Sequence, residues 1–175
     1  MRKKVSSLVY LILISVFAGC GSNDAIFQVE TFTDFQISLG LNTVEAHYFI
    51  NPNVPVTLRT QLDILNLPES DISQVVANEA FLYPKFNDNV SLEFIHDVNI
   101  FIVDPENTNR RKEIFYREAI PAGQHSEIQL FSSITDVTEF MLDDRIIVET
   151  RLEFRQFPPA TFDVRVDMKF GVYVE

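Results

Sequence analysis

The side chains that could bind a metal ion lie far apart in this sequence. Its three histidines, His47, His96 and His125, occupy three separate segments, and no two of them have the spacing of zinc ligands. A site made of all three would require the fold to bring them together, and we expect His47 and His125 to be ordinary surface residues instead. The histidines therefore predict neither a metal site nor another cofactor.

One oxygen-rich segment has side chains that could hold calcium loosely. The candidate ligands are Asp104, Glu106, Asn107 and Asn109. Pro105 lies among them, and the turn glycine of an EF-hand loop is missing. The segment is therefore typical of a solvated turn.

Catalytic constellations are also missing from the sequence. Glu149 and Glu153, the candidate carboxylate pair for glycoside hydrolysis, would lie about 13 Å apart along one strand, whereas that chemistry uses separations of about 5 to 9.5 Å. There is no G-x-S-x-G segment and no glycine-rich phosphate loop. We expect the basic cluster at 110–112 to be matched by Glu106 and Glu113 rather than by a phosphate. The sequence thus predicts no catalytic residues and a non-enzymatic protein.

The first twenty residues have the organisation of an export signal. A basic start at 2–4 is followed by an almost entirely apolar run, Val5 to Phe17, and then by Ala18-Gly19 before Cys20. A membrane-spanning helix needs about 20 apolar residues, and this run is shorter and ends in small residues. Residues 1–19 are therefore predicted to be a cleaved signal peptide.

Phe17-Ala18-Gly19-Cys20 resembles the lipobox of bacterial lipoproteins, with Phe17 where leucine is usual. The resemblance implies cleavage before Cys20, a diacylglyceryl thioether on its sulfur and acylation of the new amino terminus. Acyl chains contribute about 0.8 kcal/mol per buried CH₂, so two or three of them hold a protein stably on a membrane. An unmodified cysteine after an ordinary signal is the alternative. Gly21, rather than the aspartate that favours inner-membrane retention in enteric bacteria, points to the outer membrane.

The charge of the mature chain limits its partners. Removing residues 1–19 takes away three of 14 basic residues and none of 25 acidic ones, which leaves 11 minus 25, or −14. Such a balance argues against nucleic acid and against electrostatic adhesion to anionic lipid. We expect attachment to the membrane through the lipid anchor, and an envelope protein as the partner.

Strict alternation marks the end of the chain, residues 145–175. Even positions from Ile146 to Phe154 and from Phe162 to Val174 are apolar or nearly so, and charged residues stand between them. This period of two is that of a strand with one buried face. Pro158-Pro159 interrupts it, which predicts a long hairpin. Its expected charge pairs are Arg155 with Asp163, Glu153 with Arg165, Arg151 with Asp167 and Glu149 with Lys169.

The rest of the mature chain predicts further short strands and one helix. The expected strands cover residues 26–39, 54–64, 75–86, 92–95, 98–103, 113–119 and 127–131. The segment 54–64 also carries leucines at helical spacing. The one helix is expected over 133–142, with a capping box made by Ser133 and Asp136.

These elements predict a short lipidated tether over 20–25 and one all-β domain over 26–175. The expected fold is an antiparallel β-sandwich, with a small β-barrel as the alternative. By pattern it resembles small bacterial lipoproteins with an immunoglobulin-like or desiccation-protein-like sandwich, a resemblance that implies no activity. We expect a non-enzymatic, membrane-anchored interaction or structural module of the cell envelope. A carrier whose 16 phenylalanines line an apolar cavity is the second hypothesis, and an envelope enzyme is the third.

Overall fold

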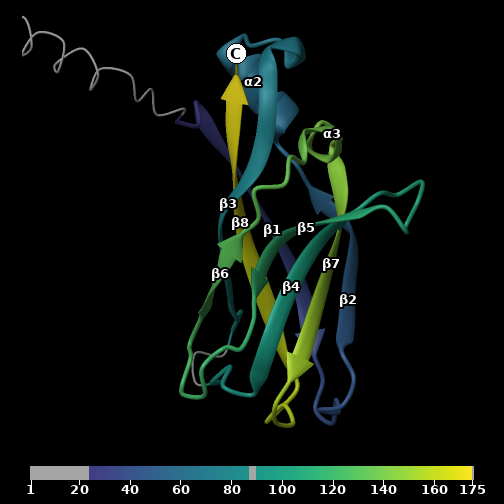
Figure 1. Ribbon diagram of the computed structural model, residues 1–175, viewed down its shortest axis with the longest axis vertical. Coiled ribbons are helices and arrows are strands. Elements are labelled where there is room, and N and C mark those ends of the chain that lie inside the picture. The colour runs from purple at the N-terminus through teal and green to yellow at the C-terminus, as the bar shows by residue number, and fades with distance from the viewer. Residues whose placement is uncertain (1–23, 87–89, 175) are drawn as a thin grey trace, which may run out of the picture.

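The computed structural model describes residues 24–86 and 90–174. This part of the chain forms eight strands and short helical segments joined by loops (Figure 1). The elements are β1 (Phe27–Ile37), β2 (His47–Pro55), α2 (Leu58–Leu65), the 3₁₀ turn η1 (Glu69–Asp71), β3 (Ile72–Pro84), β4 (Ile95–Val103), β5 (Arg111–Arg117), β6 (Ile128–Ser132), α3 (Thr138–Met141), β7 (Arg145–Phe154) and β8 (Phe162–Val174).

The strands form two antiparallel layers. The order β1-β8-β3-β6-β5-β4-β7-β2 places β1, β8, β3 and β6 in one layer and β5, β4, β7 and β2 in the other. Only two residue pairs, Phe115–Ser132 and Tyr116–Phe131, join β5 to β6. Consecutive strands thus cross repeatedly between the layers, which is the topology of a jelly roll. The predicted all-β antiparallel class is confirmed, whereas the strand order is not that of an immunoglobulin domain.

Side chains nearly close the sheet into a barrel where its edge strands β1 and β2 approach each other. The hydroxyl of Thr31 donates to the carbonyl of Pro55 at 2.6 Å, and the rings of Phe35 and Phe49 stack with centroids 4.6 Å apart. A bulge between Asn51 and Val54 makes the edge of β2 irregular. Pro55 has no backbone N–H, so β2 offers no hydrogen-bond donor to a neighbouring strand at this position.

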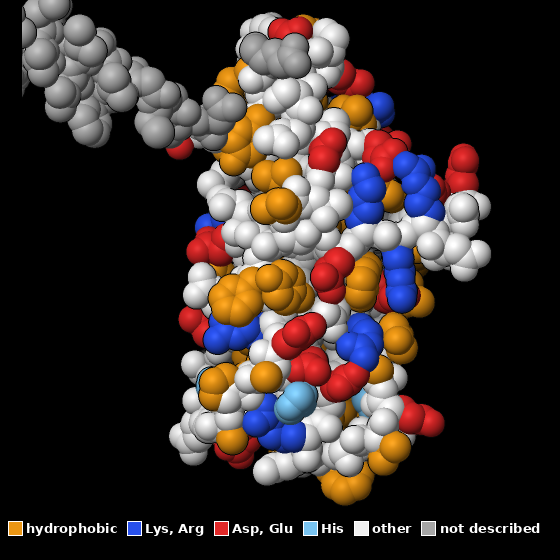
Figure 2. Space-filling model, in the orientation of Figure 1, with side chains coloured by type: hydrophobic (Ala, Val, Ile, Leu, Met, Phe, Trp, Pro, Cys, Tyr) orange, Lys and Arg blue, Asp and Glu red, His pale blue; other side chains and the backbone are white. Residues whose placement is uncertain are grey.

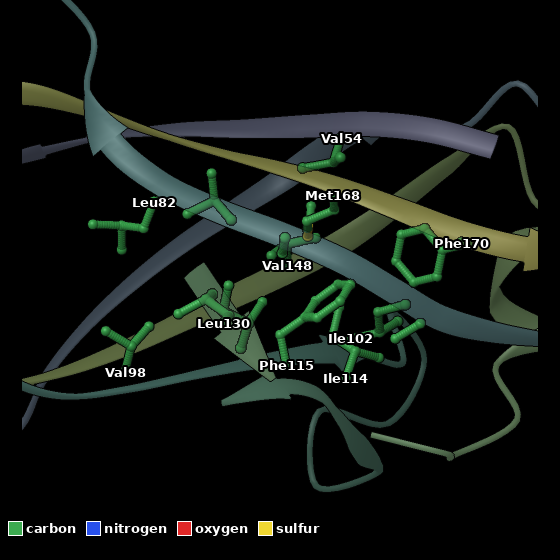
Figure 3. Packing of buried hydrophobic residues seen from close by; sticks show 14 of the residues in the cluster. Val54, Leu82, Val98, Ile102, Ile114, Phe115, Leu130, Val148, Met168 and Phe170 are labelled. Atoms are coloured by element: carbon green, nitrogen blue, oxygen red, sulfur yellow. The ribbon is translucent and has the colours of Figure 1, made fainter. Parts of the chain in front are cut away.

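One hydrophobic core fills the space between the layers. Side chains from both layers interdigitate there, among them Val148 and Ile102 from one layer and Met168 and Phe170 from the other (Figure 3). The rings of Phe115 and Phe170 meet edge to face across the layers, with centroids 5.8 Å apart. Six phenylalanines of the described residues are buried in this interior, where they pack against other apolar side chains.

The predicted C-terminal hairpin is wrong, although both of its strands exist. β7 pairs with β2 and β4, and β8 pairs with β1 and β3, so the two strands belong to opposite layers. The connection after Phe154 is therefore an arch between layers rather than a hairpin turn. Arg155 donates to the carbonyls of Ile95 and Ile120 instead of pairing with Asp163.

The alternating charges of β8 are matched by opposite charges on its neighbours β1 and β3, not on β7. On the outer face of β8, Arg165 lies opposite Asp34 of β1, and Lys169 lies opposite Glu30 of β1 and Glu79 of β3. All of these opposed pairs form ion pairs. Opposite charges across neighbouring strands stabilise whichever partner supplies them, so the charge pattern of one strand pair does not identify the pairing.

Three local predictions also need correction. The expected strand over 54–64 ends at Pro55, and 58–65 is helix α2, because Leu58 and Leu62 are buried on one helical face and Asn66 ends the helix in the left-handed conformation. The expected helix over 133–142 shortens to α3. Its N-cap is Val137, which makes no side-chain cap, so the predicted capping box is absent; Asp136 accepts the N–H of Thr138 just before the helix.

The buried hydroxyl of Thr150 yields a stability prediction. It is the one buried side-chain polar atom without a hydrogen-bond partner among the described residues. Thr150→Val replaces it with a methyl group of similar shape, so the cost of the unsatisfied hydroxyl, about 1 to 3 kcal/mol, is removed. We expect urea denaturation to show a free energy of unfolding raised by about 1 kcal/mol. Thr31→Val is the matched control, and its loss of a hydrogen bond is expected to lower stability.

A double-mutant cycle distinguishes the observed pairing from the hairpin. Arg165 contacts both carboxylate oxygens of Asp34, at 2.7 and 2.9 Å, so Asp34→Ala and Arg165→Met are expected to couple by about 1 kcal/mol. Methionine keeps an aliphatic stem over the ring of Phe32. Arg155→Ala and Asp163→Ala are expected to be additive within about 0.5 kcal/mol. Coupling between Arg155 and Asp163, together with additivity between Asp34 and Arg165, would contradict the observed pairing and support the hairpin.

Candidate functional site

The predicted lipidation site, Cys20, lies outside the described residues. Lipidation therefore stays a prediction from the lipobox pattern. Within the described residues, no helix combines the length and the apolar character that crossing a bilayer requires.

The three histidines form no joint metal site within the described chain. The Nε2 atoms of His47 and His125 lie 2.8 Å from the carbonyl oxygens of Asn42 and Pro121, respectively. Both rings are thus held by their own loops. His96 differs, since its Nδ1 lies 3.0 Å from a carboxylate oxygen of Asp97.

The oxygen-rich segment 104–109 uses its carboxylate internally. One oxygen of Asp104 accepts the backbone N–H groups of Glu106 and Asn107, and the other contacts the guanidinium of Arg110. The N–H of Glu106, with further help from Asn107 and Arg110, holds the pKa of Asp104 below its ordinary value. These contacts organise a turn, in agreement with the solvated-turn interpretation.

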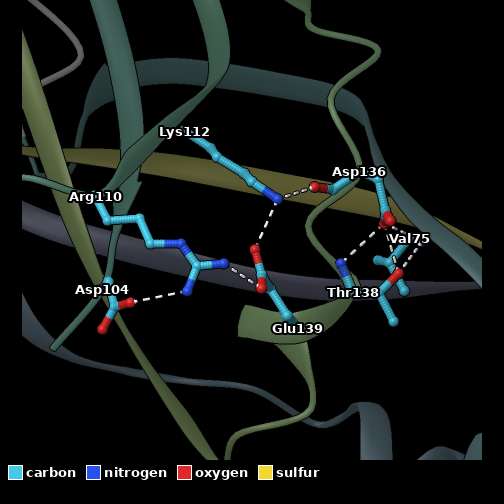
Figure 4. Close-up of polar contacts among 7 residues, drawn as sticks. All are labelled: Val75, Asp104, Arg110, Lys112, Asp136, Thr138 and Glu139. Carbon is cyan, nitrogen blue, oxygen red and sulfur yellow. Dashed lines mark hydrogen bonds and ion pairs between the residues drawn. The ribbon is translucent and has the colours of Figure 1, made fainter. Parts of the chain in front are cut away.

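The basic cluster at 110–112 has different partners from those predicted. Arg110 and Lys112 both contact Glu139 of α3, and Lys112 also donates to the carbonyl of Asp136 (Figure 4). Arg111 pairs with Glu149 of β7. The cluster therefore joins α3 and β7 to β5 instead of presenting free charges to a phosphate.

Every cation of the described chain has an intramolecular partner. Three of the 14 basic residues lie at 2–4, which leaves 11 in residues 24–174. Their partners are carboxylates, amide oxygens or backbone carbonyls. Six of these cations also lie over phenylalanine rings. Figure 2 shows basic and acidic side chains side by side on one face of the molecule.

Sequence reasoning missed one constellation, which consists of His96, Asp97 and Glu153 on the outer face of β4 and β7. One ligand atom of each residue, an imidazole nitrogen or a carboxylate oxygen, lies within 4.8 Å of the other two. Asp97 and Glu153 are opposed in the ladder, and the register shifts between Ile95 and Asp97. This shift is a β-bulge at His96, and it brings the side chains of two consecutive residues together.

Neighbouring groups hold the two carboxylates of this constellation in place. The N–H of Ala119, a residue with a φ of +48°, donates to Asp97 Oδ1 at 2.7 Å. Arg151 contacts one oxygen of Glu153 and donates to the amide oxygen of Asn99 at 2.9 Å. The sequence signal was His96-Asp97 between apolar segments, which suggested a break between strands and is instead a bulge inside β4.

Comparisons with known proteins do not identify a family. No family model matches the chain, and no curated protein matches it. One similar solved structure is described as Desmodium yellow mottle tymovirus, at 9% sequence identity and a TM-score of 0.27, covering 83% of this chain and 88% of that one. Another is the empty head of turnip yellow mosaic virus, at 11% identity and a TM-score of 0.25, covering 85% of this chain and 81% of that one.

Asp34 makes stability sensitive to acid. The hydrogen bond from Arg165 lowers its pKa most, with a further contribution from Lys85. A carboxyl with a lowered pKa in the folded state stabilises the fold above its ordinary pKa, about 3.8, and loses that contribution as the pH falls below it.

We therefore expect the stability deficit of Asp34→Asn to be largest near neutral pH and to shrink below about pH 4. Urea denaturation at a series of pH values from 7 to 3 measures this change. An Arg165→Met background is the control, because removal of the main cause weakens the pH dependence of the deficit. An equal deficit at pH 7 and pH 3 would contradict the assignment.

Proposed function

We propose that this chain is a lipid-anchored protein of the bacterial cell envelope whose β-domain serves as a non-enzymatic interaction or structural module. The observation that carries the proposal is the sequence Phe17-Ala18-Gly19-Cys20 after a basic start and an apolar run. Gly21 after the cysteine favours the outer membrane. The net charge of −14 after cleavage agrees with attachment through acyl chains rather than through basic residues.

The start of the domain supports a close attachment. The N–H of Ile26 already bonds to the carbonyl of Val172 at the end of β8. Six residue steps separate Ile26 from Cys20, and an extended chain of that length reaches about 20 Å. An acyl group on Cys20 would therefore hold this end of the domain near the bilayer.

This attachment would orient the domain. The start of β1, helix α2 and the C-terminal end of β8 lie at one end of the molecule, and the arch between β7 and β8 lies at the other (Figure 1). Ten residue steps from Val172 to Phe162 along β8 span about 33 Å. The arch and the neighbouring loops would be the part presented to envelope partners.

Features of the outer surface agree with a binding role. One depression, lined by Glu30, Phe32 and Lys169 on the outer face of β1 and β8, has a volume of about 200 Å³, below the roughly 300 Å³ of small-molecule sites. Six phenylalanines of the described chain are buried in the core, and its cations are engaged within the fold. A macromolecular partner on the acidic outer surface fits these features.

Cys20→Ala tests the anchor. In wild type we expect mass spectrometry to find a mature terminus at Cys20 carrying acyl chains, and we expect the protein in the membrane fraction. High salt is expected not to release it, because the attachment is covalent and hydrophobic. Cys20→Ala is expected to lack the acyl mass and to leave the membrane fraction, and Ser22→Ala is the matched control.

An unacylated mature terminus in wild type would refute the proposed anchor. The same strains test the interaction role through crosslinking in the native envelope. We expect an envelope protein crosslinked to wild type and lost from Cys20→Ala. Recovery of the same partner from both strains would show that anchoring is irrelevant to the role.

A further inference from the structure

We propose that His96, Asp97 and Glu153 form a binding site for a divalent transition-metal ion of the zinc class. The site is independent of the proposed membrane anchor. Its three ligand atoms lie within 4.8 Å of one another. An ion with bonds of about 2.0 to 2.2 Å holds tetrahedral ligands about 3.3 to 3.6 Å apart, so side-chain shifts of about 1 Å are enough to close the site.

The backbone positions these ligands before any ion binds. Asp97 and Glu153 are opposed residues of neighbouring strands, and the bulge brings the ring of His96 to within 3.0 Å of Asp97. Two of the three ligands thus depend on one strand pairing rather than on mobile loops. Such positioning lowers the entropy lost when the ligands close on an ion.

The contacts of the carboxylates leave each of them an oxygen for a cation. Ala119 and His96 both contact Oδ1 of Asp97, and Arg151 contacts Oε1 of Glu153. Within the described chain, Oδ2 of Asp97 and Oε2 of Glu153 have no such partner. Hydrogen bonds that orient metal-binding carboxylates from the side are usual around metal sites.

Charge and ligand type indicate the class of ion. The two carboxylates and Arg151 sum to −1 around a neutral imidazole, so a divalent cation finds a net attraction. One nitrogen and two oxygens suit zinc and its neighbours in the transition series, whereas calcium takes six to eight oxygen ligands. The side chain of His96 is 46% exposed, which leaves room for a water ligand.

Zinc binding by the full chain tests the site. Isothermal titration with ZnCl₂, on protein purified without a histidine tag, is expected to show one ion per chain. Loss of a ligand-orienting contact commonly costs about 10- to 100-fold in metal affinity, so loss of a ligand in His96→Gln or Glu153→Gln is expected to cost at least about tenfold. His125→Gln is the matched control, and its affinity is expected to equal that of wild type.

A spectroscopic measurement keeps the test independent of how the variants fold. In wild type, zinc is expected to shift the imidazole NMR signals of His96 and to leave those of His47 and His125 unchanged. Wild-type affinity in a folded His96→Gln, an equal loss in His125→Gln, or no binding at millimolar zinc would overturn the proposal. Displacement of zinc by an equal concentration of calcium would also overturn it, because the carboxylates alone would then suffice.

Discussion

The structure depends on the burial of the apolar faces of β7 and β8 in one core from opposite layers. Each strand carries a buried stripe that is apolar except at Thr150 of β7, and each is flanked on both edges by other strands. Four other strands are placed by this arrangement, because β2 and β4 satisfy the backbone of β7 while β1 and β3 satisfy that of β8. Two layers about 10 Å apart bury both stripes together.

The cations on the outer faces of the layers form ion pairs between strands and also cover phenylalanine rings. Arg165 bridges β8 to β1 through Asp34, and the same guanidinium covers the ring of Phe32. Arg111 likewise joins β5 to β7 through Glu149 and covers Phe101. The cations therefore tie strands of one layer together and cover phenylalanine rings, while the excess of carboxylates keeps the surface acidic. Such a surface resists self-association and non-specific binding to polyanions.

The two proposals place different chemistry at the two ends of one β-domain. The acylated end would be set by the short connection from Cys20 to β1. The constellation of His96, Asp97 and Glu153 lies toward the end of β7 and the start of β4, near the arch and away from the end that would be anchored. A metal site there would face the periplasm or the exterior rather than the bilayer. Anchoring and metal binding are therefore separable by mutation.

The sequence by itself determined the periodicity, the buried faces and the expected signal. Every inward residue expected from Ile146 to Phe154 is buried in the fold, because alternation is a local property of one strand. Which strands pair was decided only by the tertiary structure: opposite charges on Asp34, Glu30 and Glu79 serve Arg165 and Lys169 as well as a hairpin partner would. The sequence also could not predict that Glu153 lies beside His96 and Asp97, because this contact requires a bulge and a pairing between segments about 56 residues apart. The local pattern determines whether a side chain faces the core or solvent. Which strand lies beside it depends on how all the strands pack together around one core.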